Sequence, residues 1–133
     1  MGDGVKSPTK CSLDYLRKQG FGLVEVVERW NPFARIREDL FGFIDILAIR
    51  GNDLVAVQAT SWTNVMARVK KISELESAKL FQGGISRYIE VHGWRKRKNR
   101  FELRVIEAWW DSSGAFQHRD YAQQAKQEIP HHD

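Results

Sequence analysis

Cysteine is almost absent from this chain of 133 residues, which contains only Cys11. A single cysteine excludes an internal disulfide and a zinc site built from several cysteines, and it suits a reducing compartment. Long apolar runs are absent too, because no stretch approaches the roughly 20 residues that a membrane-spanning helix needs. Residues 1–10 lack the apolar core of a signal peptide. We therefore expect a cytoplasmic protein with no membrane partner.

The length and composition indicate one domain. A chain of 133 residues with 42% hydrophobic and 29% charged residues can bury one core and is too short for two ordinary domains. We expect a disordered segment at residues 1–10, a domain at 11–110 and a polar tail at 111–133. Within that tail, residues 118–129 have a weak helical pattern.

Positive charge is concentrated at one place. The net charge is +4, and removing the five cations of the 95–100 segment would leave about −1, so the basicity is local. A local basic patch is typical of proteins that bind a polyanion, although charged hairpin tips are often only solvated. We predict nucleic-acid contacts from this segment and from a second charged segment that follows Asn31-Pro32 and ends at Asp39. The residues are Arg35, Arg37, Arg95, Lys96, Arg97, Lys98 and Arg100.

Periodicity and turn residues predict alternating helices and strands. Ser7 or Ser12 is the expected N-cap of the first helix, and Gly20 ends it. A capping-box pattern, Ser73-Glu74-Leu75-Glu76, predicts the start of a helix or of a kinked continuation. The expected elements are a helix to residue 19, strands at 22–30, 44–49 and 54–57, helices at 64–72 and 73–82, and strands at 85–94 and 101–110.

Two polar residues interrupt the central apolar pair of strands. Asp45 and Gln58 occupy positions where a buried strand usually carries Val or Leu, and an unpartnered buried polar group costs about 1–3 kcal/mol. If the turn is the two-residue Gly51-Asn52, then Arg50 lies opposite Asp53 and Asp45 lies opposite Gln58, on one face of the sheet. A three-residue loop would separate them unless a bulge restored the register.

These residues carry a resemblance to a known family. The segment Gly42-Phe43-Ile44-Asp45, a later strand ending in Gln58-Ala59-Thr60 and the following helix resemble the core of the PD-(D/E)XK nuclease superfamily. The similarity is greatest to its small Holliday-junction-resolvase-like and phage members, over residues 12–109. It implies an α/β fold with a restriction-endonuclease-like α-β-β-β-α-β core, whose central mixed sheet is flanked by helices. It also implies a Mg²⁺- or Mn²⁺-dependent DNA endonuclease, with branched or structured DNA as one substrate class and a homodimer as one assembly.

The resemblance assigns metal binding to Asp45 and Gln58. Gln58 replaces the family's carboxylate and would offer only a carbonyl oxygen, so another acid has to supply the lost charge. The candidates are Glu28, which we favour, and the alternatives Asp14, Glu25 and Asp39. Structural roles are the alternatives: Asp45 would cap a strand end or pair with an arginine, and Gln58 would hydrogen-bond to the backbone.

The family's catalytic lysine is replaced by Thr60, whose hydroxyl brings no positive charge to the developing phosphorane. Some members carry the lysine on the next helix, which points to Lys71 or Arg68. The sequence therefore leaves two readings open. One is an active nuclease, and the other is a catalytically inactive nuclease-fold protein that binds nucleic acid or serves as an interaction subunit.

Overall fold

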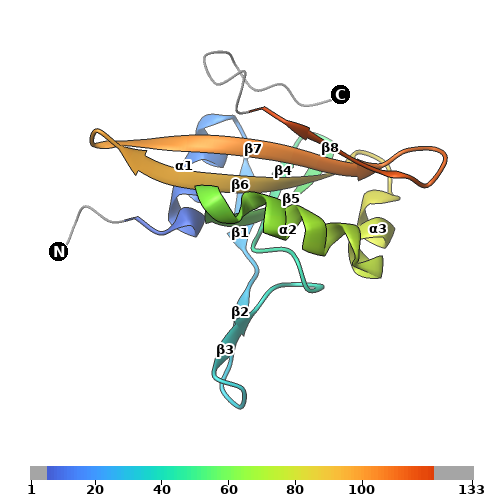
Figure 1. The fold of residues 1–133 in the computed structure, drawn as a ribbon, viewed down its shortest axis with the longest axis horizontal. Coiled ribbons are helices and arrows are strands. Elements are labelled where there is room, and N and C mark those ends of the chain that lie inside the picture. The colour runs from blue at the N-terminus through green and yellow to red at the C-terminus, as the bar shows by residue number, and fades with distance from the viewer. Residues whose placement is uncertain (1–5, 122–133) are drawn as a thin grey trace.

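The computed structural model describes residues 6–121, which form a six-stranded mixed sheet with helices on both faces (Figure 1). The strand order is β1-β4-β5-β6-β7-β8; β5 and β6 are parallel, and every other neighbouring pair is antiparallel. The predicted α/β class with a mixed central sheet is confirmed. The strands are β1 (Leu23–Val26), β4 (Ile46–Arg50), β5 (Asp53–Ser61), β6 (Arg87–Arg97), β7 (Arg100–Trp110) and β8 (Phe116–Asp120).

Three α-helices and one 3₁₀ turn complete this part of the chain. The helix α1 (Pro8–Lys18) begins at the Ser7 cap, whose Oγ accepts the Lys10 N–H at 3.1 Å, and Pro8 occupies a first-turn position where no N–H is needed. The parallel crossover from β5 to β6 runs through η1 (Trp62–Asn64), α2 (Val65–Ser73) and α3 (Glu76–Gln82). No helix in residues 6–121 has the length and apolarity needed to cross a membrane.

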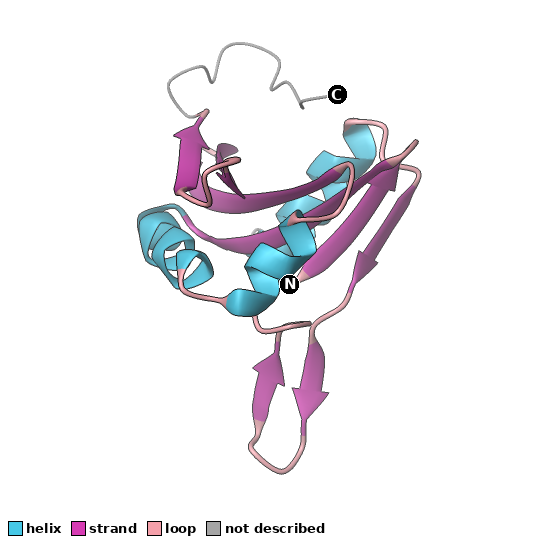
Figure 2. Cartoon of the chain, turned by 90° about the vertical axis from the view of Figure 1, so that its right-hand side faces the viewer, coloured by secondary structure: helices cyan, strands magenta, loops and turns pink. Residues whose placement is uncertain are grey.

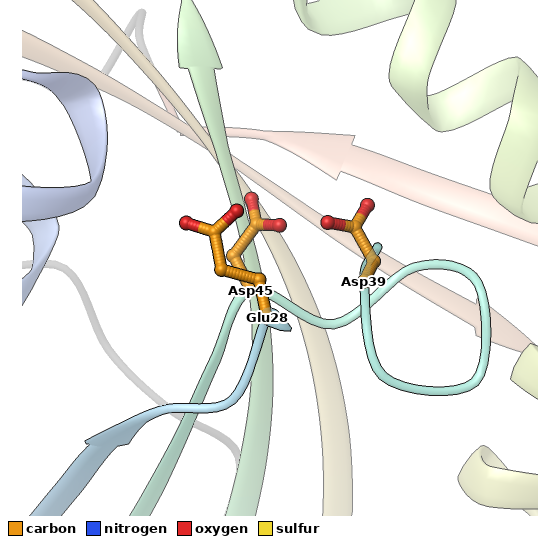
Figure 3. Close-up of side chains that lie close together, drawn as sticks. All are labelled: Glu28, Asp39 and Asp45. Carbon is orange, nitrogen blue, oxygen red and sulfur yellow. The ribbon is translucent and has the colours of Figure 1, made fainter. Parts of the chain in front are cut away.

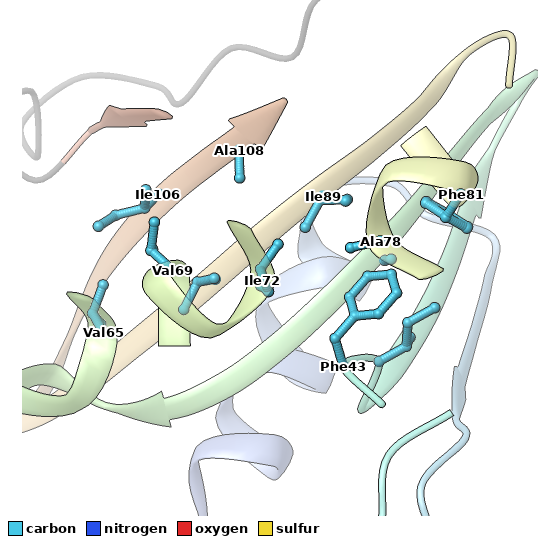
Figure 4. Packing of buried hydrophobic residues seen from close by; sticks show 12 residues of the cluster. Phe43, Val65, Val69, Ile72, Ala78, Phe81, Ile89, Ile106 and Ala108 are labelled. Atoms are coloured by element: carbon cyan, nitrogen blue, oxygen red, sulfur yellow. The ribbon is translucent and has the colours of Figure 1, made fainter. Parts of the chain in front are cut away.

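The sheet is covered on both faces, which explains the nearly continuous apolar runs of β4 and β5. On one face, Leu16 of α1 packs with Val55 and Val57. On the other face, Val69 and Ile72 of α2 pack with a cluster that extends to β7 and to Phe43 (Figure 4). Successive β5 residues therefore enter different cores, and Gln58 and Thr60 belong to the positions that alternate onto the α2 face.

The predicted strand at residues 22–30 is wrong in one respect, because the chain leaves the main sheet after Val26. The partner strand β4 begins at Ile46, directly opposite Val26, so the ladder ends there. The chain then forms a separate two-stranded hairpin, β2 (Arg29–Asn31) and β3 (Ile36–Glu38), which projects from the body (Figures 1 and 2). Thus Glu28 lies in a short link between two sheets.

The C-terminal segment also departs from the prediction. Residues 116–120 form the edge strand β8 and not the start of a helix at 118; the remaining predicted helical residues, 122–129, lie outside the described part. The side chain of Asp111 accepts the N–H groups of Ser113 at 2.9 Å and Ala115 at 3.0 Å, and this turn returns the chain along the free edge of β7. Pairing with β7 outweighs the weak helical pattern.

Two helix starts differ from the sequence predictions. Helix α1 already begins at Pro8, so the expected disordered segment does not extend to residue 10; residues 1–5 are outside the described range. The capping box at 73–76 does not form, because Ser73 Oγ donates to the Lys70 carbonyl at 2.6 Å and so closes α2. The next helix, α3, accordingly begins only at Glu76.

Candidate metal centre

Three carboxylates meet where the projecting hairpin joins the main sheet. Glu28 lies between β1 and β2, Asp39 follows β3, and Asp45 immediately precedes β4. Each offers one oxygen, and these oxygens all lie within 4.8 Å of one another (Figure 3). Asp45 is buried while the other two are partly exposed. The cluster is thus anchored in the protein and open toward solvent.

The register of β4 and β5 explains the position of Asp45. Arg50 lies opposite Asp53, as the two-residue turn predicts, and the pairs continue back to Ile46 opposite Val57. Asp45 extends this pairing, since its N–H donates to the Val57 carbonyl at 2.9 Å. Its carboxylate Oδ2 accepts the Ala59 N–H at 2.8 Å, which fixes the carboxylate beside β5.

No lysine or arginine in residues 6–121 forms an ion pair with the three acids. The pKa of Asp45 is raised to about 8, mainly by burial and then by the hydrogen bond and negative charge of Asp39 and the charge of Glu28, against the opposing effect of the Ala59 N–H. Carboxylates crowded in this way share a proton unless a cation is bound. Near neutral pH, a divalent cation and a proton therefore compete for the site.

Gln58 adds an amide to the carboxylates. Its side chain is only 2% exposed, and Nε2 donates to Asp39 Oδ2 at 2.8 Å. Its Oε1 is buried and has no hydrogen-bond partner among the described residues. A buried carbonyl without a partner is uncommon, so the Gln58 amide oxygen is available to a metal ion that binds oxygen ligands. Hydrogen bonds to Asp39 therefore connect Asp45 and Gln58. Asp39 was one of the alternative acids in the sequence, and Glu28 was the favoured one.

The donor set fits a hard divalent cation. Mg²⁺ binds oxygen at ~2.1 Å, so opposite ligands of an octahedral ion lie ~4.2 Å apart, which is comparable with the 4.8 Å limit on the separation of the three oxygens. Asp45, Asp39 and Glu28 would hold the ion. Gln58 would add Oε1 as a neutral ligand once its amide turns over, because Nε2 now donates to Asp39. The other candidate acids are not part of this cluster. Asp14, on α1, pairs with Lys6, which precedes the helix. Glu25 is exposed and lies within β1.

Among the described residues, the predicted replacements for lysine form no hydrogen bond or ion pair with the three acids. Thr60 is 6% exposed and lies opposite Gly93 of β6. Arg68 is partly buried and Lys71 is exposed on α2. Within residues 6–121, neither cation forms an ion pair with the three acids.

The basic residues lie on two hairpins that leave the same end of the sheet as the carboxylates. The ladder between β6 and β7 extends to Arg97 opposite Arg100, so the predicted 95–100 loop shrinks to Lys98-Asn99. Both turn residues have positive φ, at 50° and 64°, as a tight hairpin turn requires. Arg35 lies in the turn of the other hairpin and Arg37 on β3. All seven residues predicted to contact nucleic acid therefore lie on the β2–β3 hairpin or the β6–β7 hairpin.

Three cations of the β6–β7 hairpin already have partners: Arg97 lies 4.0 Å from Glu102, Lys96 lies over the Phe101 ring, and Arg95 is held most closely. The Arg95 guanidinium lies over the Trp62 ring, 3.8 Å from its centroid, and Nε donates to Glu102 at 2.7 Å. This interaction holds the pKa of Glu102 below its ordinary value. The exposed Lys98 and Arg100 at the tip are better placed to meet an external anion.

A second polar cluster lies on the α1 face and was not predicted. Ser12 Oγ accepts from Trp94 Nε1 and contacts His92 Nδ1, both at 2.8 Å, while His92 Nε2 contacts Glu90 at 2.8 Å. Because Trp94 can only donate, Ser12 is free to donate to His92, which then donates to Glu90. Ser12 and His92 are fully buried, so this chain of hydrogen bonds joins α1 to the sheet and does not face a substrate.

Comparisons with known proteins identify no relative: no family model, no curated protein and no solved structure matches this chain.

Proposed function

We propose that this protein is a divalent-metal-dependent nuclease that hydrolyses phosphodiester bonds in DNA. The observation that carries the proposal is that oxygens of Asp45, Asp39 and Glu28 lie within 4.8 Å of one another, beside the Gln58 amide, whose buried oxygen has no hydrogen-bond partner among residues 6–121. A bound Mg²⁺ or Mn²⁺ supplies Lewis acidity and activates water there. The three acids supply the negative charge that Gln58 cannot.

The order of elements supports the same assignment. Leaving out the β2–β3 hairpin, the chain runs α1, β1, β4, β5, α2 with α3, and β6, with β6 parallel to β5. This is the α-β-β-β-α-β order of the PD-(D/E)XK superfamily that the sequence resembles. If the chain shares that arrangement, Asp45 and Gln58 correspond to the family's two acidic motif residues.

The surroundings of the site favour a long polyanion. Glu28 and Asp39 are partly exposed, and two hairpins that carry basic residues project from the body of the protein. Lys98 and Arg100 would contact the backbone on one side, and Arg35 and Arg37 on the other. Such contacts make binding salt-dependent, with a slope of roughly −0.9 per neutralised phosphate in a log–log plot.

A DNA-binding protein without nuclease activity is the second candidate. One observation favours it: buried Thr60 replaces the family's lysine, and no cation contacts the three acids in residues 6–121. For the active enzyme, Lys71 or Arg68 would have to approach the attacked phosphate when DNA binds.

Cleavage assays on plasmid, linear and four-way-junction DNA in Mg²⁺ or Mn²⁺ test the proposal. We expect metal-dependent cutting that Asp45→Asn, Asp39→Asn and Glu28→Gln each reduce by at least about a hundredfold, because each removes a charged ligand. Glu25→Gln is the matched control, since it removes an exposed acid three positions before Glu28 and should leave cutting unchanged.

The outcomes separate the two candidates. Cutting that is lost in Asp45→Asn and reduced in Lys71→Gln or Arg68→Gln supports the nuclease and locates its phosphate-facing cation. DNA binding without cutting in either metal, unchanged by Asp45→Asn, rejects the nuclease and leaves the binding protein. Cutting that persists undiminished in all three acid variants would show that the activity belongs to a contaminant or to another site.

A further inference from the structure

We infer that the β2–β3 hairpin, residues 29–38, binds unpaired bases of the DNA substrate and so selects DNA that contains a bulge, fork or junction. This inference rests on the proposed function for the identity of the ligand. Its observations are separate from the metal centre: an exposed aromatic tip, a rigid turn and a local excess of positive charge.

The hairpin is connected directly to the candidate metal site. Glu28 immediately precedes β2, and Asp39 immediately follows β3. Figure 2 shows the two strands extending from the body, with the loop at the far end. Whatever the hairpin binds is thus held at a fixed distance from the carboxylates.

Large apolar side chains are exposed along this hairpin. Phe33 at the tip is 96% exposed, and Trp30 and Ile36 are each just over half exposed. Isolated two-stranded hairpins are marginally stable in water, and exposed apolar groups clustered on one are typical of a contact surface. The hairpin therefore has the character of an arm that a partner covers.

The tip holds its shape without a partner. Asn31 Oδ1 accepts the N–H groups of Phe33 at 2.9 Å and Ala34 at 3.1 Å, and the Asn31 carbonyl accepts the Arg35 N–H at 2.8 Å. The other end of the Asn31 amide donates to Glu38 at 3.1 Å. A turn fixed by four hydrogen bonds presents Phe33 with little entropy left to lose on binding.

The charge of the arm identifies its partner. Arg29, Arg35 and Arg37 face a single acid, Glu38, which already accepts from Asn31, so the arm carries a net charge of +2. Cations around an exposed aromatic ring match nucleic acid, because phosphates pair with the arginines while a base stacks on the ring. Bases in an intact duplex are already stacked, so the ring requires an unpaired base or a step that it can open.

The length of the arm sets where the unpaired base should lie. Phe33 is five positions along the chain from Glu28, and because part of this stretch is a turn, it spans at most ~16 Å at ~3.3 Å per strand residue. Nucleotides rise ~3.4 Å along a strand, so this limit corresponds to about five nucleotides. We expect the cut within about five nucleotides of the unpaired base.

Fluorescence anisotropy of the full-length protein in EDTA measures binding without cutting. The probes are a short DNA duplex and the same duplex with a bulge that contains 2-aminopurine. Phe33→Ala should weaken binding to bulged DNA about tenfold, equivalent to ~1.4 kcal/mol, and should alter duplex binding less than about twofold. It should also abolish the wild-type change in 2-aminopurine fluorescence. Leu80→Ala, which truncates a similarly exposed apolar residue on α3, is the control and should bind like wild type.

Three results would overturn the inference. Phe33→Ala could bind bulged DNA as wild type does, or the wild type could fail to prefer the bulge over the duplex. Sedimentation could instead show a wild-type dimer that Phe33→Ala converts to a monomer, in which case a second copy covers the arm. Because binding is measured without metal, Phe33-dependent bulge binding without any cutting would reject only the proposed nuclease activity, whereas cutting that ignores Phe33 would reject only this inference.

Discussion

Replacing Asp45 by Asn should make the metal-free protein more stable at alkaline pH. The pKa of Asp45 is raised from 3.8 to about 8 by burial and by the neighbouring Asp39 and Glu28. Between these two values the folded protein binds one more proton than the unfolded chain. The free energy of unfolding therefore falls as pH rises, by ~1.4 kcal/mol per pH unit. The stabilisation that the Asp45 proton provides is complete below about pH 4 and is lost as the pH passes about 8.

The magnitude follows from the pKa difference of about 4 units, which corresponds to ~6 kcal/mol over the whole range. Between about pH 5 and pH 8 the expected loss is ~4 kcal/mol. Asparagine resembles the protonated acid, because its carbonyl can accept the Ala59 N–H and its amide can donate to Asp39. Asp45→Asn should thus equal wild type below about pH 4 and gain ~4 kcal/mol on it between pH 5 and pH 8.

Urea denaturation at a series of pH values in EDTA measures this difference. Asp14→Asn is the control, since the pairing with Lys6 lowers the pKa of Asp14 and the acid stays ionised throughout this range. Parallel stability curves for wild type and Asp45→Asn from pH 5 to pH 8 would show that Asp45 is ionised in the folded protein, and the reasoning would fail. Added Mg²⁺ or Mn²⁺ should stabilise wild type near pH 8 by ~2.7 kcal/mol at a concentration of 100 times Kd, and Asp45→Asn much less.

Other substitutions test the fold and the basic hairpin. Gly93→Ala should destabilise the protein by about 1–3 kcal/mol in thermal or urea unfolding, because the new Cβ would overlap Val65 Cγ2 at the start of α2; unchanged stability would show that α2 shifts freely. Ser12→Ala should lower stability by about 1–3 kcal/mol, since it removes the Ser12 hydroxyl that His92 Nδ1 and Trp94 Nε1 contact; a neutral effect would contradict the proposed hydrogen-bond chain. Lys98→Gln should weaken DNA binding equally for all sequences and lower the log–log salt slope by roughly 1; an unchanged slope would place the phosphate elsewhere.

Local sequence information was sufficient for the central hairpin. The Gly51-Asn52 turn fixes Arg50 opposite Asp53, and because side chains alternate along a strand, this register determines which residues enter each core. Helical periodicity likewise placed α2 within one residue at each end, since Val65, Val69 and Ile72 all face the sheet. These features depend on neighbours in the chain, which explains why they could be predicted.

The cluster of three acids depends on contacts between distant segments. Asp45 was identifiable as a polar residue in an apolar run, and Glu28 was the favoured additional acid. Asp39 was one of several equivalent acids, because no periodic pattern marks a residue that follows a short hairpin. Asp39 lies beside Glu28 and Asp45 because β1 and β4 end their pairing at Val26 and Ile46, and the chain between them leaves the main sheet.

The sequence by itself determined the α/β class, the register of the central strands, and Asp45 and Gln58 as polar residues in a buried hairpin. Only the tertiary structure decided that residues 29–38 form a projecting arm, that residues 116–120 pair with β7, and that three acids share one point. The physical reason is that turns and alternation act over a few residues, whereas strand ends, free edges and charge clusters depend on where distant segments stop.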